Sequence, residues 1–337
     1  MAGPGTSGPD AQGPGAGITK RSYWVLPAIS PGHDRLELPG GVASVVGENG
    51  RVPELPEVQA LVDFLRERTG GLAIVGIELG SISVLKTYDP PPTSLHGLPV
   101  GNVTRHGKFI DIEAEGLHLV FHLAKAGWLR WSDALAATMI RPRKSPIALR
   151  CRLSDGSGFD LTEAGTQKRL AAYIVRDPAQ VPGIARLGPD PMAEDFTAGD
   201  FAALLEGRRT QVKGLLKDQG FLAGVGNAYS DEVLHAARLS PFALASSLDQ
   251  EQVQRLYAAL RATLAGAVNA ASGRPAKELK DAKRAGMGVH GRTGQACPVC
   301  GDVVREVSFA DSSLQYCATC QTGGKPLADR RMSRLLK

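Results

Sequence analysis

The spacing of apolar residues changes twice along the chain. From residue 54 to 69, Val58, Leu61, Val62 and Leu65 recur at the i, i+3, i+4, i+7 spacing of an amphipathic helix. Between residues 72 and 175, short alternating or apolar runs separated by Gly, Asp and Pro predict strands at 72–79, 109–114, 118–123, 147–153 and 171–175. After a Pro-rich link, the helical spacing returns at 197–206, 209–218, 228–237 and 248–271. We therefore expect an α+β protein in which a β-sandwich with flanking helices precedes a helical domain.

Residues 1–52 differ in composition from the rest of the chain. The first 18 residues hold six Gly and three Pro, too little apolar surface to offset the entropy of ordering. Four basic and four acidic residues cancel within 1–52, so the whole formal charge of +5 belongs to residues 53–337. That charge is only a mild indication of a polyanionic partner. We expect residues 1–52 to be a disordered or non-native extension.

Four of the five cysteines form one C-terminal cluster. Cys297 and Cys300 make one Cys-x2-Cys pair, and Cys317 and Cys320 make a second pair sixteen residues later. Two such pairs place four thiolates around one zinc ion, and the intervening length suits a β-hairpin. The alternative is four buried or disulfide-linked cysteines, which a chain without a secretion signal disfavours. The spacing predicts one structural zinc ion in a ribbon at 289–325, followed by a basic tail at 326–337.

Three further segments carry candidate chemistry, and each has a simpler explanation. Gly220, Gly224 and Gly226 allow a tight double turn that places Asn227 at a helix start suited to phosphate, although a plain helical hairpin also fits. Lys108 lies at a predicted strand start beside two basic residues, where a solvated charge run is the alternative. The run Pro-Glu-Leu-Pro-Glu-Val at 53–58 also fits a proline-initiated helix with acidic residues in its first turn.

Together these features, in this order, resemble the formamidopyrimidine-DNA glycosylase and endonuclease VIII family of base-excision repair enzymes over residues 53 to about 325. The resemblance implies a catalytic β-sandwich at 53–180, a helix-two-turns-helix domain at 190–285 and the zinc finger. It implies that Pro53, as an N-terminal amine, attacks C1′ of a damaged nucleotide to form a Schiff base, with strand cleavage by elimination. Glu54 would be the acid/base, Glu57 would organise the helix start, and Lys108 would bind phosphate or supply a proton.

The resemblance also implies a set of DNA contacts to an extruded nucleotide and to the opposite strand. The expected DNA-binding residues are Lys125, Gln167, Lys168, Lys213, Gly226, Asn227 and Arg305. Lys125 stands where relatives that excise 8-oxoguanine place a methionine wedge, and Ser312 stands where the finger carries an arginine. The family's Asp-Pro-Arg-Arg-Phe-Gly run is absent at 161–169, and the loop between 281 and 289 is short. We therefore expect oxidised pyrimidines, ring-opened purines or abasic sites as substrates, rather than 8-oxoguanine.

Within a longer chain, Pro53 is a tertiary amide whose lone pair is delocalised and cannot attack. Our hypothesis is that Val52 marks the true start, read as methionine at a GTG codon and then trimmed. Two alternatives stay open, a catalytically silent binder of damaged DNA and a zinc-ribbon protein of transcription or translation. We expect a monomeric, cytoplasmic, nucleoid-associated protein that binds damaged double-stranded DNA. No membrane partner is expected, because no run of about 18 apolar residues is present.

Overall fold

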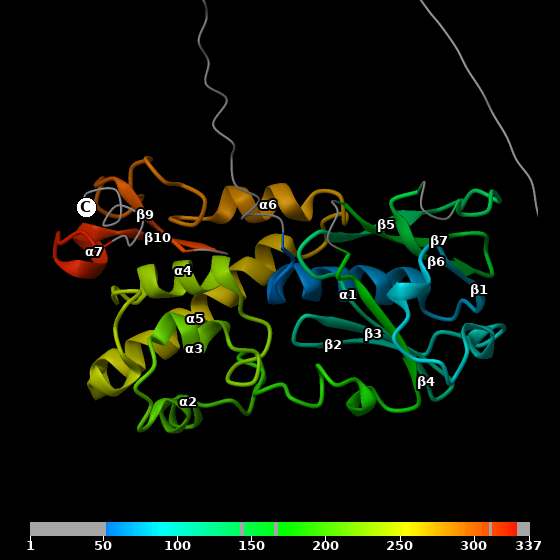
Figure 1. Ribbon diagram of the computed structural model, residues 1–337, viewed down its shortest axis with the longest axis horizontal. Coiled ribbons are helices and arrows are strands. Elements are labelled where there is room, and N and C mark those ends of the chain that lie inside the picture. Colours follow the sequence, from blue (N-terminus) through cyan, green and yellow to red (C-terminus); the bar gives the residue numbers. More distant parts are fainter. Residues whose placement is uncertain (1–51, 142–144, 165–167, 310–311, 329–337) are drawn as a thin grey trace, which may run out of the picture. The chain divides into compact units, whose positions relative to one another are not determined.

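The computed structural model describes residues 52–141, 145–164, 168–309 and 312–328 (Figure 1). These residues all belong to the compact unit Gly47–Lys337. Except for Val52, the predicted extension at 1–52 lies outside the described residues, and so does the predicted basic tail beyond Ala328. No described helix is long and apolar enough to cross a membrane.

Helix α1 (Leu55–Thr69) begins at the Pro-Glu-Leu-Pro-Glu run, as the sequence predicts. Pro56 stands in the first turn, where a missing N–H costs nothing. The Glu57 carboxylate accepts a 2.8 Å hydrogen bond from the backbone N–H of Glu54, the residue that precedes the helix. Val58, Leu61, Val62 and Leu65 form the buried face, which confirms the periodicity.

Two four-stranded antiparallel sheets form the first half of the described chain. The strand order in one sheet is β1 (Ile74–Leu79), β6 (Ile147–Leu153), β7 (Gly158–Glu163) and β5 (Gly127–Ser132). The strand order in the other is β2 (Asn102–His106), β3 (Phe109–Ala114), β4 (Leu117–His122) and β8 (Ala171–Val175). Short 3-10 turns η1 (Ile82–Val84), η2 (Pro92–Leu95) and η3 (Pro178–Gln180) lie in the connections. The predicted β-sandwich is confirmed.

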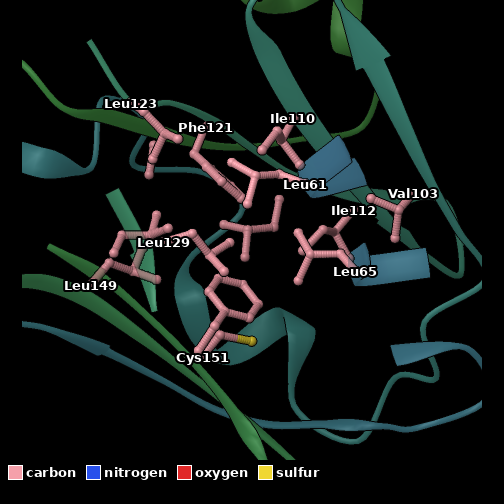
Figure 2. Packing of buried hydrophobic residues seen from close by; sticks show 14 of the residues in the cluster. Leu61, Leu65, Val103, Ile110, Ile112, Phe121, Leu123, Leu129, Leu149 and Cys151 are labelled. Atoms are coloured by element: carbon pink, nitrogen blue, oxygen red, sulfur yellow. The ribbon is translucent and has the colours of Figure 1, made fainter. Parts of the chain in front are cut away.

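A single apolar core joins the two sheets and helix α1. Alternate residues of β3 and β6, such as Ile110, Ile112 and Leu149, point into it (Figure 2). Leu61 and Leu65 of α1 lie among them (Figure 2). Because the buried face of α1 packs in this core, the position of the helix start is fixed relative to both sheets.

The helical half has its own core. It contains α2 (Ala198–Leu205), α3 (Val212–Lys217), α4 (Asn227–Ala236), η4 (Ala245–Ser247), α5 (Gln250–Ala271) and α6 (Leu279–Gly286). Leu55, the first residue of α1, is fully buried in this second core, whereas the rest of the α1 face packs in the first. Helix α1 thus connects the two halves at its N-terminus.

The C-terminal segment is a small ribbon. Strands β9 (Val304–Ser308) and β10 (Ser313–Cys317) form an antiparallel hairpin, followed by the short helix α7 (Ala318–Thr322). Buried Val304 and Val289 pack with the cysteines, and a second small apolar cluster holds Val307, Leu314, Tyr316 and Ala318. The predicted hairpin between the two cysteine pairs is confirmed.

Candidate active site

One carboxylate, that of Glu54, joins the start of α1 to the start of α4. Figure 1 shows where these two helices lie in the fold. The buried Glu54 side chain accepts hydrogen bonds from the backbone N–H groups of Gly226 at 2.6 Å, Ala228 at 3.0 Å and Tyr229 at 3.3 Å. These N–H groups have no partner inside the helix, and the helix dipole favours a negative charge there. Two sequence motifs separated by 172 residues therefore form one site.

The double turn before α4 brings its backbone against α1. Gly224 adopts φ of +88°, in the left-handed region, and its carbonyl accepts a 3.0 Å hydrogen bond from the N–H of Leu55. The Gln219 side chain closes the turn, because it accepts from the N–H of Gly224 and donates to the carbonyl of Val225. At Gly226, an added Cβ would lie 2.4 Å from Cδ of Glu54. The glycines are thus required for the close approach of the carboxylate.

Lys283 of α6 provides a buried positive charge at the same place. Its Nζ atom lies 2.9 Å from Oε2 of Glu57 and 3.6 Å from Oε1 of Glu54. It also donates a 2.9 Å hydrogen bond to the carbonyl of Val52 and lies 4.9 Å from the ring centre of Tyr229. The other Glu57 oxygen accepts a 2.6 Å hydrogen bond from the Tyr229 hydroxyl.

The electrostatics of the cluster keep Glu54 ionised. Burial alone would raise the pKa of Glu54, but the charges of Lys283 and Lys108 and the N–H of Ala228 hold this pKa below its ordinary value. Burial would likewise lower the pKa of Lys283, but Glu54 and Glu57 raise it, so this amine is an ammonium ion. The pKa of Lys108 is lowered by burial in spite of the nearby Glu54. Glu54 is therefore equipped to accept a proton.

The structure brings the four residues proposed for catalysis to one place. Pro53 is buried directly before α1, and Glu54 and Glu57 follow it. Lys108 occupies the turn between β2 and β3, next to Gly107 with φ of +57°, and is half-buried. It forms no hydrogen bond with any described residue, so its ammonium is available to a ligand. Pro53 is acylated by Val52 in this chain, so its nitrogen carries no nucleophilic lone pair here.

The residues expected to bind DNA do not lie together as the catalytic residues do. Lys125 is exposed in the β4–β5 loop and forms no ion pair with the described residues. Lys168 is exposed, and its ammonium donates a 2.6 Å hydrogen bond to the carbonyl of Glu163. Gln167 lies outside the described residues. The role of all three in DNA binding stays a prediction.

Lys213 and Asn227 belong to internal networks. The buried ammonium of Lys213 pairs with Asp231 at 2.6 Å and donates to the Ser230 hydroxyl and to the carbonyl of Asn227. The Asn227 amide donates a 2.8 Å hydrogen bond to the carbonyl of Ser313, which connects α4 to the finger. The buried Asn227 Oδ1 has no hydrogen-bond partner among the described residues. DNA binding by Lys213 and Asn227 therefore also stays a prediction.

Arg305 lies on β9 in the finger hairpin. Its guanidinium is 3.7 Å from the Asp302 carboxylate, and its buried Nε has no partner in the described part of the chain. An unpaired guanidinium nitrogen costs free energy unless a ligand or water satisfies it. This position agrees with the expected contact to a phosphate. DNA binding by Arg305 stays a prediction.

The four clustered cysteines fit one structural zinc ion. Their sulfur atoms all lie within 4.8 Å of one another, with 3.9 Å between Cys297 and Cys320 and 3.3 Å between Cys300 and Cys317. Tetrahedral ligands about 2.3 Å from one ion lie about 3.8 Å apart, which matches these separations. Nε2 of His235, on α4, lies 3.3 Å from the sulfur of Cys297, so the zinc site is attached to the helical domain.

Sequence reasoning missed Lys283 and Tyr229. Lys283 follows buried Leu279 by four residues on a highly charged short helix, a pattern that reads as a solvated face. Tyr229 falls inside the predicted helix at 228–237, where an aromatic side chain reads as core. Neither residue carries a local signal, because their shared partner Glu57 lies far away in the sequence.

Three family models match the chain, in the same order as the structural segments. They are the formamidopyrimidine-DNA glycosylase N-terminal domain at 52–170, the formamidopyrimidine-DNA glycosylase H2TH domain at 187–277 and the zinc finger found in FPG and IleRS at 294–323. The second model is the helix-two-turns-helix that contains Gly226 and Asn227.

Similar proteins agree with these models. A formamidopyrimidine-DNA glycosylase of Heliobacterium modesticaldum is 34% identical over 287 residues, covering 80% of this chain and 100% of that protein. A formamidopyrimidine-DNA glycosylase-like protein of Mycobacterium tuberculosis is 55% identical over 159 residues, 47% of this chain and 99% of that protein. The structure of MutM in complex with DNA containing carbocyclic 8-oxo-G matches with a TM-score of 0.70 at 26% identity, over 80% of this chain and 100% of that one. The chain therefore belongs to the formamidopyrimidine-DNA glycosylase family.

Proposed function

We propose that this chain excises damaged bases from DNA and cleaves the strand at the resulting abasic site, with the Pro53 nitrogen as nucleophile once residues 1–52 are absent. One observation carries the proposal. An ionised, buried Glu54 carboxylate lies directly beside Pro53 and is anchored on the N–H groups of Gly226 and Ala228. A purely structural carboxylate at this depth costs free energy, whereas a general base next to a secondary amine has a chemical use.

The proposed reaction uses the site as follows. The lone pair of the Pro53 nitrogen forms a bond to C1′ while the glycosidic bond breaks, and the base leaves with the electron pair and takes a proton from water. The N–H proton of Pro53 passes to Glu54, which transfers it to the ring oxygen O4′ as the ring opens to an iminium ion. Glu54, a carboxylate again after this transfer, takes a proton from C2′ while the C3′–O bond breaks and the 3′-phosphate leaves with that electron pair, which cleaves the strand. Water then hydrolyses the iminium ion and releases the protein.

Lys108 supports this reaction as a phosphate ligand and proton donor. Burial lowers its pKa, so its ammonium gives up a proton more readily than that of an exposed lysine. The charge of Glu54 acts on Lys108, so the two groups lie at the same site. The substrate is damaged double-stranded DNA, because chemistry at C1′ requires extrusion of the nucleotide. With this substrate we expect the protein at the nucleoid, as a monomer.

The test is borohydride trapping on a duplex with one abasic site. Protein that begins at Pro53, made from a Met-Pro start, is compared with the 337-residue chain. We expect a covalent adduct only with the first, since trapping requires a free amine at the sugar. Pro53→Gly should retain trapping, because a terminal glycine also offers an amine, and Glu54→Gln should slow it at least about 100-fold. Equal trapping by both forms would overturn the role of the Pro53 nitrogen.

A panel of duplexes then ranks the substrates. Excision of oxidised pyrimidines, ring-opened purines and 8-oxoguanine is measured with the same Pro53-initiated protein. We expect 8-oxoguanine to be the poorest substrate, because Lys125 replaces the wedge and the recognition segment at 161–169 is rewritten. Faster excision of 8-oxoguanine than of the other lesions would contradict this assignment.

One observation favours a second function, binding of damaged DNA without catalysis. The Val52 carbonyl is held by Lys283, so the Val52–Pro53 peptide is accommodated in the site rather than excluded from it. A chain that keeps its upstream residues would retain the fold and lack the nucleophile. Tight binding of an abasic duplex by the full chain, together with no adduct from either form, would support this second function.

A further inference from the structure

The ammonium of Lys283 is enclosed on every side that the structure describes. It contacts Glu57 at 2.9 Å, Glu54 at 3.6 Å and the Val52 carbonyl at 2.9 Å, and it faces the Tyr229 ring. Only 4% of its side chain is exposed. The family role of Pro53 and Glu54 does not account for a third charged residue at this position.

Contacts before and after helix α6 hold the helix in place and so fix the position of Lys283. Before the helix, the Trp128 side chain donates a 3.1 Å hydrogen bond to the carbonyl of Ala276, and Leu279 is buried in the sandwich core. After the helix, the Glu232 carboxylate accepts from three consecutive N–H groups, those of Gly288, Val289 and His290. The position of Lys283 is therefore set by the fold rather than by a flexible loop.

The same geometry places Lys283 next to the Pro53 nitrogen. That nitrogen is two bonds from the Val52 oxygen, about 1.23 and 1.33 Å long. With the 2.9 Å hydrogen bond, the Lys283 ammonium lies at most about 5.5 Å from the Pro53 nitrogen. At this separation two like charges repel each other appreciably inside a protein.

The charges around the Pro53 nitrogen come from several parts of the fold. Glu54 and Glu57, at the start of α1, favour a protonated amine, while Lys283 of α6 and Lys108 of the β2–β3 turn oppose it. The charge of His290 also acts on Glu54, and Lys217 of α3 acts on Lys108. Tyr229 of α4 is neutral, because burial and the Glu57 charge raise its pKa. Without Lys283, two carboxylates would face the amine, and the partly desolvated Lys108 and the more remote His290 and Lys217 would balance them less well.

We propose that Lys283 is a positioning residue that keeps the terminal amine of Pro53 unprotonated, and so nucleophilic, near neutral pH. This inference rests on the proposed function, since it concerns the amine that the proposed function requires. Lys283 takes no part in bond making. Its ammonium pairs with Glu57 and lies next to Pro53. A protonated Pro53 amine would be a second positive charge there and is therefore disfavoured. The amine thus starts the reaction with its lone pair free, and the N–H proton leaves only after the bond to C1′ has formed.

The experiment measures the pH dependence of borohydride trapping by Pro53-initiated protein. The Heliobacterium modesticaldum relative is matched along its whole length by 80% of this chain, and all described helices and strands lie after residue 52 within one compact unit, so the Pro53-initiated protein keeps every described element of the fold. Lys283→Gln, which keeps a hydrogen-bond donor, and Lys283→Met both remove the charge. We expect the acid midpoint of trapping to move up by about one to two pH units in both variants, from the like-charge repulsion lost at about 5.5 Å.

Two comparisons separate this role from a merely structural one. Lys283→Arg keeps the charge and should keep the wild-type midpoint even if its rate falls. Lys280 lies on the same helix as Lys283, and its ammonium is 4.2 Å from the centre of the Trp128 ring. Lys280→Met removes this charge and should also leave the acid midpoint of trapping unchanged. A rate loss in Lys283→Gln that is equal at every pH, or no change at all, would overturn the proposal.

A second measurement does not depend on catalysis. Titration of the terminal proline by NMR in 13C,15N-proline-labelled protein gives the pKa of the amine directly, because the terminal proline alone carries an ionisable nitrogen. We expect this pKa to be higher by about one to two units in Lys283→Gln than in the wild type. Equal amine pKa values in the two proteins would refute the role of Lys283. A higher pKa in Lys283→Gln without any trapped adduct would support the role of Lys283 and refute the proposed function.

Discussion

The backbone N–H of Gly226 donates a 2.6 Å hydrogen bond to the Glu54 carboxylate, across 172 residues of sequence. This contact joins the start of the sandwich helix to the start of α4, so the two halves of the protein share one buried charge. Because the carboxylate also accepts from Ala228 and Tyr229, its position depends on the close approach that only glycine allows at 226.

Gly226→Ala should therefore disrupt both the fold and the site. The new Cβ would meet Glu54 at 2.4 Å, and overpacking of this kind costs about 1–3 kcal/mol. We expect a lower free energy of unfolding in chemical denaturation and loss of borohydride trapping. Gly199→Ala in α2 is the matched control, since its Cβ would come no closer than 3.5 Å to Thr197 Oγ1. Wild-type stability in Gly226→Ala would show that the carboxylate is not confined.

Much of the fold follows from local pattern. Helix α1 was predictable because its apolar face, its proline and its acidic first turn all lie within sixteen residues. Strand β7 was not predicted, because it begins at a glycine with φ of +157° and carries Asp160 and Glu163. Those acids have partners that the local pattern does not reveal. The Arg150 guanidinium donates to Asp160 at 2.7 Å, and the N–H groups of Arg169 and Leu170 donate to Glu163.

The sequence likewise predicts some residues of the candidate site and not others. Pro53, Glu54, Gly226 and the four cysteines lie in motifs whose spacing is visible in the sequence. Lys283 lies in no such motif, because it belongs to the site through its contact with the Glu57 carboxylate, 226 residues away. A buried ion pair is a property of the packed fold, and hydrophobic periodicity carries no information about it.

Removal of the metal should unfold the finger. The ribbon buries two small apolar clusters among its described residues, so we expect zinc binding to supply much of its folding free energy. We expect Cys300→Ser, or treatment with a strong chelator, to lower the zinc content from one per chain to near zero and to abolish DNA binding. Cys151→Ala is the control, because Cys151 is buried in the sandwich core and should leave the zinc content at one. Full zinc content in Cys300→Ser would contradict the four-cysteine site.

Lys125→Ala should weaken DNA binding without altering stability. The side chain is exposed and has no ion pair with the described residues, so its loss leaves the core intact. If Lys125 contacts a phosphate, the slope of log K against log salt concentration should fall by about one. The matched control is Lys86→Ala, another exposed lysine, located between η1 and η2, for which we expect an unchanged slope. Identical slopes in the two variants would remove Lys125 from the DNA-binding surface.

The stability of the sandwich should fall in mild acid because of His122. Burial, together with the nearby charge of Lys108, lowers the pKa of His122 to about 4, and its Nδ1 accepts a 3.1 Å hydrogen bond from the N–H of Ala124. The folded protein thus holds a neutral imidazole, whereas the unfolded chain takes up a proton near pH 6.5. Stability from this group is complete above pH 6.5 and declines as the pH falls towards 4, by up to about 3 kcal/mol.

His122→Asn tests this sign, because asparagine keeps an acceptor for Ala124 and has no ionisable group. The free energy of unfolding is measured from pH 7.5 to 4 in denaturant titrations of both proteins. We expect the wild type to lose stability more steeply than His122→Asn between pH 6.5 and 4, with parallel curves above that range. His96→Gln, at an exposed position, should follow the wild-type curve. Parallel curves for His122→Asn over the whole range would mean that His122 has the same pKa in the folded and the unfolded protein, so that neither burial nor the charge of Lys108 lowers it.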